Sequence, residues 1–133
     1  MIRLILAAAL FTSSAAAHEL TPTYPELVPS YVTGVSMTRM HLWNRRNDVE
    51  YYEIEVFDEE FNGLPFASAD RIIKVGYLEH KTFEVYIREA DLIKVKYICT
   101  SSKQLKEDVL STGVKSRICS KVKWDKLWDF FIA

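Results

Sequence analysis

Hydrophobic and polar side chains alternate in short runs along most of the chain. In residues 49–57, Tyr52, Ile54 and Val56 alternate with charged residues, and residues 81–88 repeat this pattern. A two-residue period is that of a β-strand with one buried face. Runs with this period, or with β-type composition, occur at residues 18–29, 35–44, 49–57, 64–68, 71–77, 81–88, 93–100 and 114–124.

Turn-forming residues separate these runs. Asn62-Gly63 closes the turn at residues 58–63, and the first run carries Pro22, Pro25 and Pro29. Proline is confined to the edges of sheets, so this run is expected to be an extended edge segment. Seven or eight short strands at this spacing are typical of a sandwich. We therefore predict an all-β chain in which residues 18–124 form a single immunoglobulin-like β-sandwich of about seven strands.

Two local features complete this picture. In the second run, Val35 and Met37 are in one phase of the alternation and Met40 in the other, which predicts a β-bulge at Arg39. The last residues, 125–133, form a short aromatic tail that we expect to dock on a sheet. Apolar residues recur there at i, i+3, i+4 and i+7, which is the spacing of a short amphipathic helix: Trp124, Leu127, Trp128 and Phe131.

The first seventeen residues differ from the rest. Arg3 precedes an uninterrupted apolar run, residues 4–11, and residues 15–17 are three alanines. This is the pattern of a signal peptide, and we expect cleavage after Ala17. The apolar run is too short to span a bilayer, although an uncleaved anchor is the alternative. The mature chain is thus expected to be exported, periplasmic or secreted, without a membrane span.

Charge and motifs narrow the functional classes. The chain has 17 basic and 18 acidic residues, so it offers no basic excess for nucleic acid. The sequence contains no GxSxG, HExxH or glycine-rich phosphate loop. We therefore expect a protein that is not an enzyme and has no cofactor.

Two cysteines, Cys99 and Cys119, are expected to form a disulfide because an even count in an exported chain favours pairing. The alternative is two buried free thiols. The strand pattern is inconsistent at this point: Cys99 shares a face with Val95 and Tyr97, whereas Cys119 shares one with charged residues such as Lys121. Either a β-bulge shifts one strand, or Val95 and Tyr97 lie on an outer face under the aromatic tail.

His18 would be the first residue of the mature chain. Its α-amine and imidazole together suit Cu(II), and a second ligand would have to come from His41 or His80. No histidine pair is spaced in the sequence for such a ligand, so we expect no tight copper site. The alternative is that His18 is simply the first residue of a frayed end.

From residue 35 onward the pattern resembles the N-terminal domain of the periplasmic pilus-assembly chaperones. Residues 36–44, with Ser36-Met37-Thr38 and Leu42-Trp43-Asn44, resemble the family's second strand, and 51–57 the third. Residues 94–102 and 115–123 resemble its last two strands. The resemblance covers roughly residues 20–124 and consists of strand and turn patterns.

The resemblance implies an immunoglobulin-like fold and, in one branch of the family, a disulfide where Cys99 and Cys119 stand. Lys121 or Lys123 matches the lysine of the family's binding cleft. The family's arginine on the first strand has no counterpart in residues 20–28, and the family's second domain is missing. A complete pilus chaperone is therefore not expected.

On these grounds we expect the function of an exported, non-catalytic binding or assembly module, chaperone-like or structural. Its partner would be another protein, bound by β-strand addition. The expected surface is the last strand, with Val114, Ile118, Val122 and Trp124 on its apolar face and Lys121 beside them. Either the aromatic tail or a partner is expected to cover that face. The alternative function is a periplasmic copper protein that uses the mature N-terminal His18.

Overall fold

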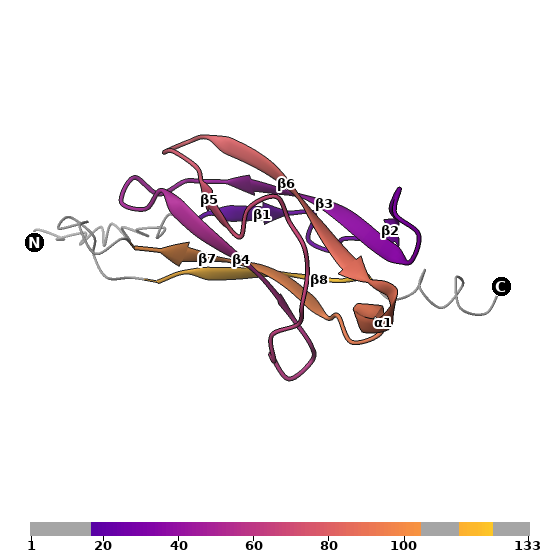
Figure 1. The fold of residues 1–133 in the computed structure, drawn as a ribbon. Helices are drawn as coiled ribbons and strands as arrows, with labels where there is room; N and C mark the ends of the chain where they lie inside the picture. The colour runs from indigo at the N-terminus through magenta and orange to yellow at the C-terminus, as the bar shows by residue number, and fades with distance from the viewer. Residues whose placement is uncertain (1–16, 105–114, 124–133) are drawn as a thin grey trace, which may run out of the picture.

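The computed structural model describes residues 17–104 and 115–123, and these form two antiparallel sheets packed face to face (Figure 1). The first sheet contains β1 (Glu19–Thr21), β2 (Val28–Pro29), β3 (Val35–Trp43) and β6 (His80–Arg88). The second contains, in spatial order, β5 (Ile72–Lys74), β4 (Tyr51–Phe57), β7 (Tyr97–Lys103) and β8 (Arg117–Lys121). A short helix, α1 (Glu89–Leu92), follows β6. The predicted all-β immunoglobulin-like sandwich is therefore confirmed.

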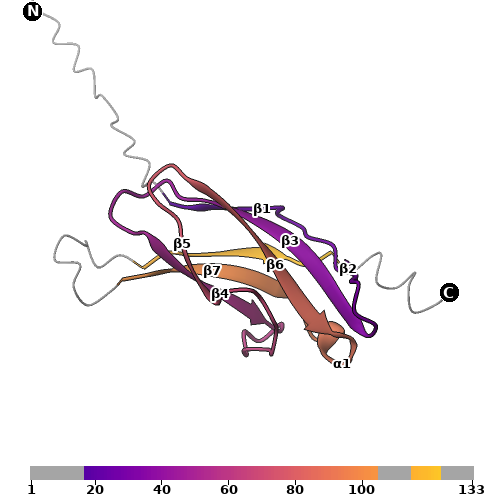
Figure 2. The same cartoon turned by 45° about the horizontal axis from the view of Figure 1, so that its top comes forward.

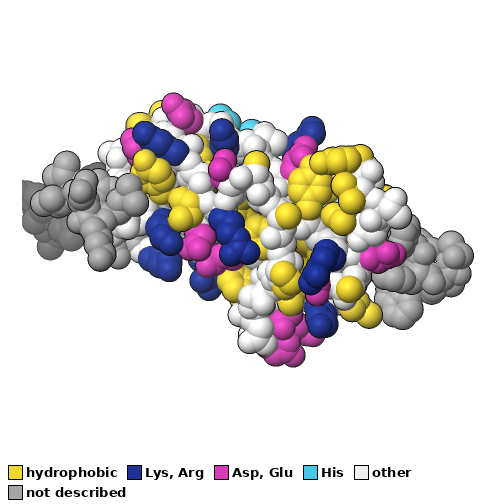
Figure 3. Space-filling model, viewed as in Figure 1, with side chains coloured by type: hydrophobic (Ala, Val, Ile, Leu, Met, Phe, Trp, Pro, Cys, Tyr) yellow, Lys and Arg dark blue, Asp and Glu magenta, His cyan; other side chains and the backbone are white. Residues whose placement is uncertain are grey.

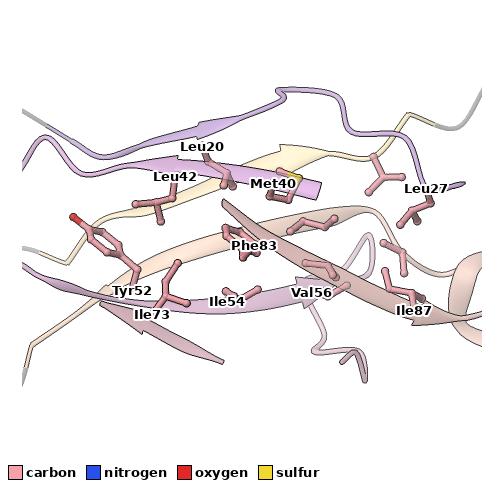
Figure 4. Close-up of a cluster of buried hydrophobic side chains, with 14 of the residues drawn as sticks. Leu20, Leu27, Met40, Leu42, Tyr52, Ile54, Val56, Ile73, Phe83 and Ile87 are labelled. Carbon is pink, nitrogen blue, oxygen red and sulfur yellow. The ribbon is translucent and has the colours of Figure 1, made fainter. Parts of the chain in front are cut away.

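Alternating side chains of both sheets build the core. Every second residue of β4 is buried, and β6 buries Phe83, Val85 and Ile87 in the same way. Figure 4 shows side chains from the two sheets meeting in the space between them, including Leu42 from β3 and Tyr52 from β4. Burial of these apolar side chains is the main favourable term in folding such a domain.

The proline-containing first segment runs along one side of the sandwich (Figure 2). β6 pairs with β3 along its whole length, so β1 and β2 must share the opposite edge of β3. Between β1 and β2 the chain turns to β8: the Lys121 N–H donates to the Thr23 carbonyl at 3.0 Å, and the Lys123 N–H donates to Pro25 at 2.9 Å. The segment thereby closes the side of the sandwich between β3 and β8, as expected of an edge segment.

The predicted bulge at Arg39 is wrong. The pairing of β3 with β6 runs without interruption from Val35 to Trp43. The inward positions are those of Thr38, Met40 and Leu42, while Val35 and Met37 lie on the outer face, half-buried. The buried Thr38 therefore occupies an inward position of the same regular alternation as Met40 and Leu42.

Three further expectations need correction. Residues 64–68 form no strand, although Ala67 makes an isolated bridge to Tyr86. The run at residues 71–77 is longer than β5, and its last residue, Tyr77, lies beyond the end of that strand and is 55% exposed. Residues 93–96 precede β7, and α1 occupies the connection from β6 instead. Elements of four residues carry too little periodicity to be found in a sequence.

A buried amide fixes the connection from β3 to β4. The Nδ2 of Asn44 donates to the carbonyls of Val49 (2.7 Å) and Val75 (2.8 Å). Its Oδ1 accepts from the Tyr52 hydroxyl (2.5 Å) and from the Arg46 backbone N–H (2.9 Å). Asn44 is fully buried, and these four bonds satisfy both ends of its amide.

Candidate functional site

A hollow of about 700 Å³ lies along the edge of β6 that faces away from β3, and we call it the β6 groove. Residues 68–70 and Ile73 line one side and residues 81–84 of β6 the other, and Arg39, Tyr31 and Tyr86 complete the lining. Phe83 and Ile73 supply the apolar part of the lining. The groove therefore runs beside an exposed strand edge.

The backbone of β6 offers hydrogen-bonding groups to this groove. Tyr86 exchanges two hydrogen bonds with Ala67 (2.8 and 2.9 Å), and the Ser68 hydroxyl donates to the Glu84 carbonyl at 2.8 Å. Residues 86 and 84 thus direct their backbone groups away from β3. Because these directions alternate along a strand, the N–H and C=O of Thr82 also point outward. Among residues 17–104 and 115–123, no strand pairs with this part of β6.

Charged side chains border the groove in mixed signs. Arg39 and Glu84 form an ion pair at 2.8 Å, and the Tyr86 hydroxyl donates to Glu84. The bond from Tyr86, with that from Arg39, lowers the pKa of Glu84, and the same bond raises the pKa of Tyr86 to about 12. Figure 3 shows basic and acidic side chains in small interspersed groups over this face of the molecule. A partner would therefore meet both signs of charge.

A row of ring side chains occupies the outer face of the first sheet. The His80 ring is stacked on Trp43, with centroids 5.1 Å apart and planes 6° apart, and it lies 4.9 Å from the His41 ring. The Nε2 of His41 and Nδ1 of His80 are 2.7 Å apart, and the Nδ1 of His41 is 3.2 Å from Thr82 Oγ1. Arg45 places its guanidinium over Trp43 at 5.1 Å.

Sequence reasoning missed the contact between the two histidines. They are 39 residues apart in the chain, and only the β3–β6 register makes them neighbours. His41 lies opposite Thr82 and His80 opposite Trp43, so the two are diagonal neighbours on one face. The alternation in both runs could have placed them on the solvent face, but no sequence signal gives the register. The spacing of the histidines in the sequence therefore gives no sign of this pair, which only the fold brings together.

His18, the candidate copper ligand, lies in the interior instead. Its side chain is 1% exposed, and its Nε2 is 2.8 Å from Thr100 Oγ1 and 3.0 Å from the Thr100 carbonyl. The Nδ1 is 3.2 Å from the Ser116 hydroxyl. Burial lowers the pKa of His18 to about 4. Both ring nitrogens are engaged with the second sheet, so His18 is neither a frayed end nor a free ligand.

His18 also lies on the wrong face of its sheet to meet the other two histidines. Leu20, two residues on, points into the core, whereas Glu19 and Thr21 pair with the outward residues Trp43 and His41. Within the described part of the chain, no group of three or more His, Cys, Asp or Glu side chains is placed to hold a metal ion.

The predicted disulfide is confirmed: Cys99 and Cys119 are bonded and directly paired across β7 and β8. No bulge shifts the register. The second explanation, a position on the outer face, is right for Tyr97. Its ring is stacked on that of Phe61, with centroids 4.6 Å apart. Val95 precedes β7 and belongs to the core.

The proposed partner face of the last strand is turned inward. Val122 is a core residue at 2% exposure, Ile118 packs against the core, and Lys121 is exposed. Val114 and Trp124 lie outside the described residues, as do residues 1–16 of the expected signal peptide and residues 125–133 of the expected aromatic tail. Ile118 and Val122 are thus covered by the core itself, so these two need neither the tail nor a partner to cover them, contrary to the expectation for this face. A partner-binding role for these residues stays a prediction.

Among the residues that the structure describes, no helix has the length and apolar character of a membrane span.

Comparisons with known proteins give a likeness among solved structures only. No family model matches the chain, and no curated protein matches it. Among solved structures, the ASH / PapD-like domain of human CEP192 (PapD-like domain 7) is similar, with 10% sequence identity and a TM-score of 0.47. The match covers 80% of this chain and 82% of that one.

Proposed function

We propose that this chain is an exported, non-catalytic module that binds an extended segment of another protein along the open edge of β6. The observation that carries the proposal is the coincidence of that edge with the β6 groove. The partner segment would add a strand to the first sheet, beyond the bridge that Ala67 makes to Tyr86. This places the binding edge on β6, whereas the sequence suggested the last strand.

Strand addition needs unpaired backbone groups that face solvent, together with room for side chains. β6 supplies outward N–H and C=O groups at Thr82. Glu84, two residues later, also points outward, but its carbonyl already accepts a hydrogen bond from Ser68. The β6 groove supplies the room, with Phe83 and Ile73 available to an apolar side chain. Lys81 and Asp70 also line the groove and offer one charge of each sign.

The last strand is a weaker candidate for the same role. One end of its free edge is closed, because the N–H groups of Lys121 and Lys123 already donate to Thr23 and Pro25. A partner there would therefore find part of this edge already occupied.

Export rests on two features of the chain. Residues 1–17 have the composition of a signal peptide, and the Cys99–Cys119 disulfide fits an oxidising compartment. Cleavage after Ala17 would retain His18, whose side chain is the first buried one among the described residues.

The test is a proline at the outward position of the edge. Thr82→Pro removes an N–H that points away from β3, so the ladder of the sheet is kept, as for prolines on natural edge strands. The matched control, Thr82→Val, keeps the N–H and the β-branched shape. Short random peptides displayed on phage would be selected against the wild-type protein, and a selected peptide titrated against the three proteins.

We expect the proline variant to lose at least tenfold in affinity, about 1.4 kcal/mol, while the valine variant binds as the wild type does. Hydrogen exchange should show the Thr82 and Glu84 amides becoming protected when the peptide binds. Circular dichroism verifies that both variants are folded. Selected peptides that bind the proline and valine variants equally would contradict a β6 binding edge.

A further inference from the structure

Independently of any protein partner, we propose that His41 and His80 form a copper site on the outer face of the first sheet. The two residues come from neighbouring strands, and their facing nitrogens, Nε2 and Nδ1, are 2.7 Å apart. His80 is exposed and His41 half-buried, so an ion has access to the pair. The site would be a two-nitrogen chelate with its remaining positions taken by water.

The two nitrogens are close enough to bind one ion. Ligands at about 2.0 Å from an ion lie about 2.8 Å apart at right angles and about 3.3 Å apart in a tetrahedral site, and the nitrogens start from a separation of 2.7 Å. The choice of metal rests on affinity, because Cu(II) is the divalent first-row ion that nitrogen ligands bind most tightly.

The rings need only a small rearrangement to bind an ion. The centroid separation of 4.9 Å shows that the nitrogens now face one another across a hydrogen bond. Both lone pairs must converge on the ion, and this turn costs little because the χ2 torsion of histidine has broad minima. The hydrogen bond between the rings is lost, and His80 then carries its proton on Nε2 with no change in net charge.

Neighbouring side chains hold both rings in place. Thr82 Oγ1, at 3.2 Å from His41 Nδ1, can accept the proton of that nitrogen and leave Nε2 free as a ligand. Trp43 is stacked on His80 and restricts its ring. Arg45, whose guanidinium lies over the Trp43 ring, adds a positive charge that repels a bound cation. Removal of that charge should strengthen binding.

The experiment titrates the wild-type protein and its variants with CuCl₂. Cu(II) quenches nearby indole fluorescence, so Trp43 reports on the site, and Trp43→Phe identifies its share of the signal. We expect His41→Ala and His80→Ala each to lower copper affinity at least tenfold, and Arg45→Ala to raise it. Thr82→Val should lower it by less than either histidine variant.

Electron paramagnetic resonance distinguishes this site from the amino terminus, which binds Cu(II) in any protein. The wild-type spectrum should show coupling to two imidazole nitrogens, and the double variant His41→Ala/His80→Ala should retain the terminal background alone. Circular dichroism verifies the fold of each variant. Copper affinity and spectra that are unchanged in both single histidine variants would overturn the proposal.

Discussion

A buried neutral histidine should make this protein sensitive to mild acid. His18 is 1% exposed, and its ring nitrogens contact Thr100 and Ser116. Burial lowers its pKa from 6.5 to about 4 in the folded protein. In the unfolded chain His18 has its ordinary pKa. Between the two pKa values, His18 is therefore protonated in the unfolded chain and neutral in the folded one. The change to test is His18→Gln, which removes the titrating group but keeps a polar side chain.

The sign and size follow from linkage. The unfolded state binds more protons between pH 6.5 and pH 4, so the stability that neutral His18 contributes is complete above pH 6.5 and is lost as the pH falls towards 4. The full difference of the two pKa values is worth about 3 kcal/mol. About 1 kcal/mol is lost by pH 5.5 and about 2.5 kcal/mol by pH 4.5.

The assay is urea unfolding of the wild type and His18→Gln from pH 7.5 to pH 4.5, followed by circular dichroism with the disulfide intact. All other groups are the same in both proteins, so their contributions to the pH dependence cancel in the difference. The free energy of unfolding of the wild type should fall by about 2.5 kcal/mol more than that of the variant. Parallel pH dependences would refute the placement of a neutral imidazole in the interior.

Three other predictions concern processing and stability. The protein purified after export should begin at His18, and alkylation under denaturing, non-reducing conditions should label no thiol, both of which intact-mass measurement checks. Cys99→Ser/Cys119→Ser should lower the free energy of unfolding by about 3 kcal/mol, because the disulfide closes a loop of 20 residues; a variant as stable as the wild type would contradict this. Asn44→Ala should lower the free energy of unfolding by about 2–4 kcal/mol, because it leaves several buried hydrogen-bond partners unsatisfied. Tyr52→Phe leaves only one partner unsatisfied and should lower it by about 1 kcal/mol. Equal losses for the two variants in urea unfolding would argue against this network.

The sandwich was predictable because its long central strands bury one face each. Residues 49–57 and 81–88 alternate cleanly, and both become strands with the predicted residues in the core. The first segment was also predictable as an edge, since proline cannot donate to a ladder. Periodicity of two carries this information without any knowledge of the partner strand.

The errors arise where one side chain departs from the pattern that its neighbours suggest. Thr38 is polar by composition but lies inward, and Tyr97 is aromatic but lies on the outer face under Phe61. His18 was judged as a chain end, whereas its ring fills an interior position that the sequence presents as polar. Burial of a polar group depends on partners such as Thr100, which only the folded arrangement supplies.

The cysteine pair and the histidine pair have the same physical origin, yet only the first could be predicted. In an antiparallel sheet the side chains approach most closely at positions that do not share ladder hydrogen bonds. Cys99 and Cys119 occupy such a pair, with Cα atoms 4.1 Å apart, and His41 and His80 are diagonal across two adjacent pairs of that kind. In a chain with two cysteines, each has only one possible intramolecular partner. The pairing can therefore be predicted without knowing the register of the strands. Histidines have no such rule, and their meeting follows only from β3 and β6 being aligned from Val35 to Trp43. The outer face of the first sheet is therefore where the structure adds most to the sequence.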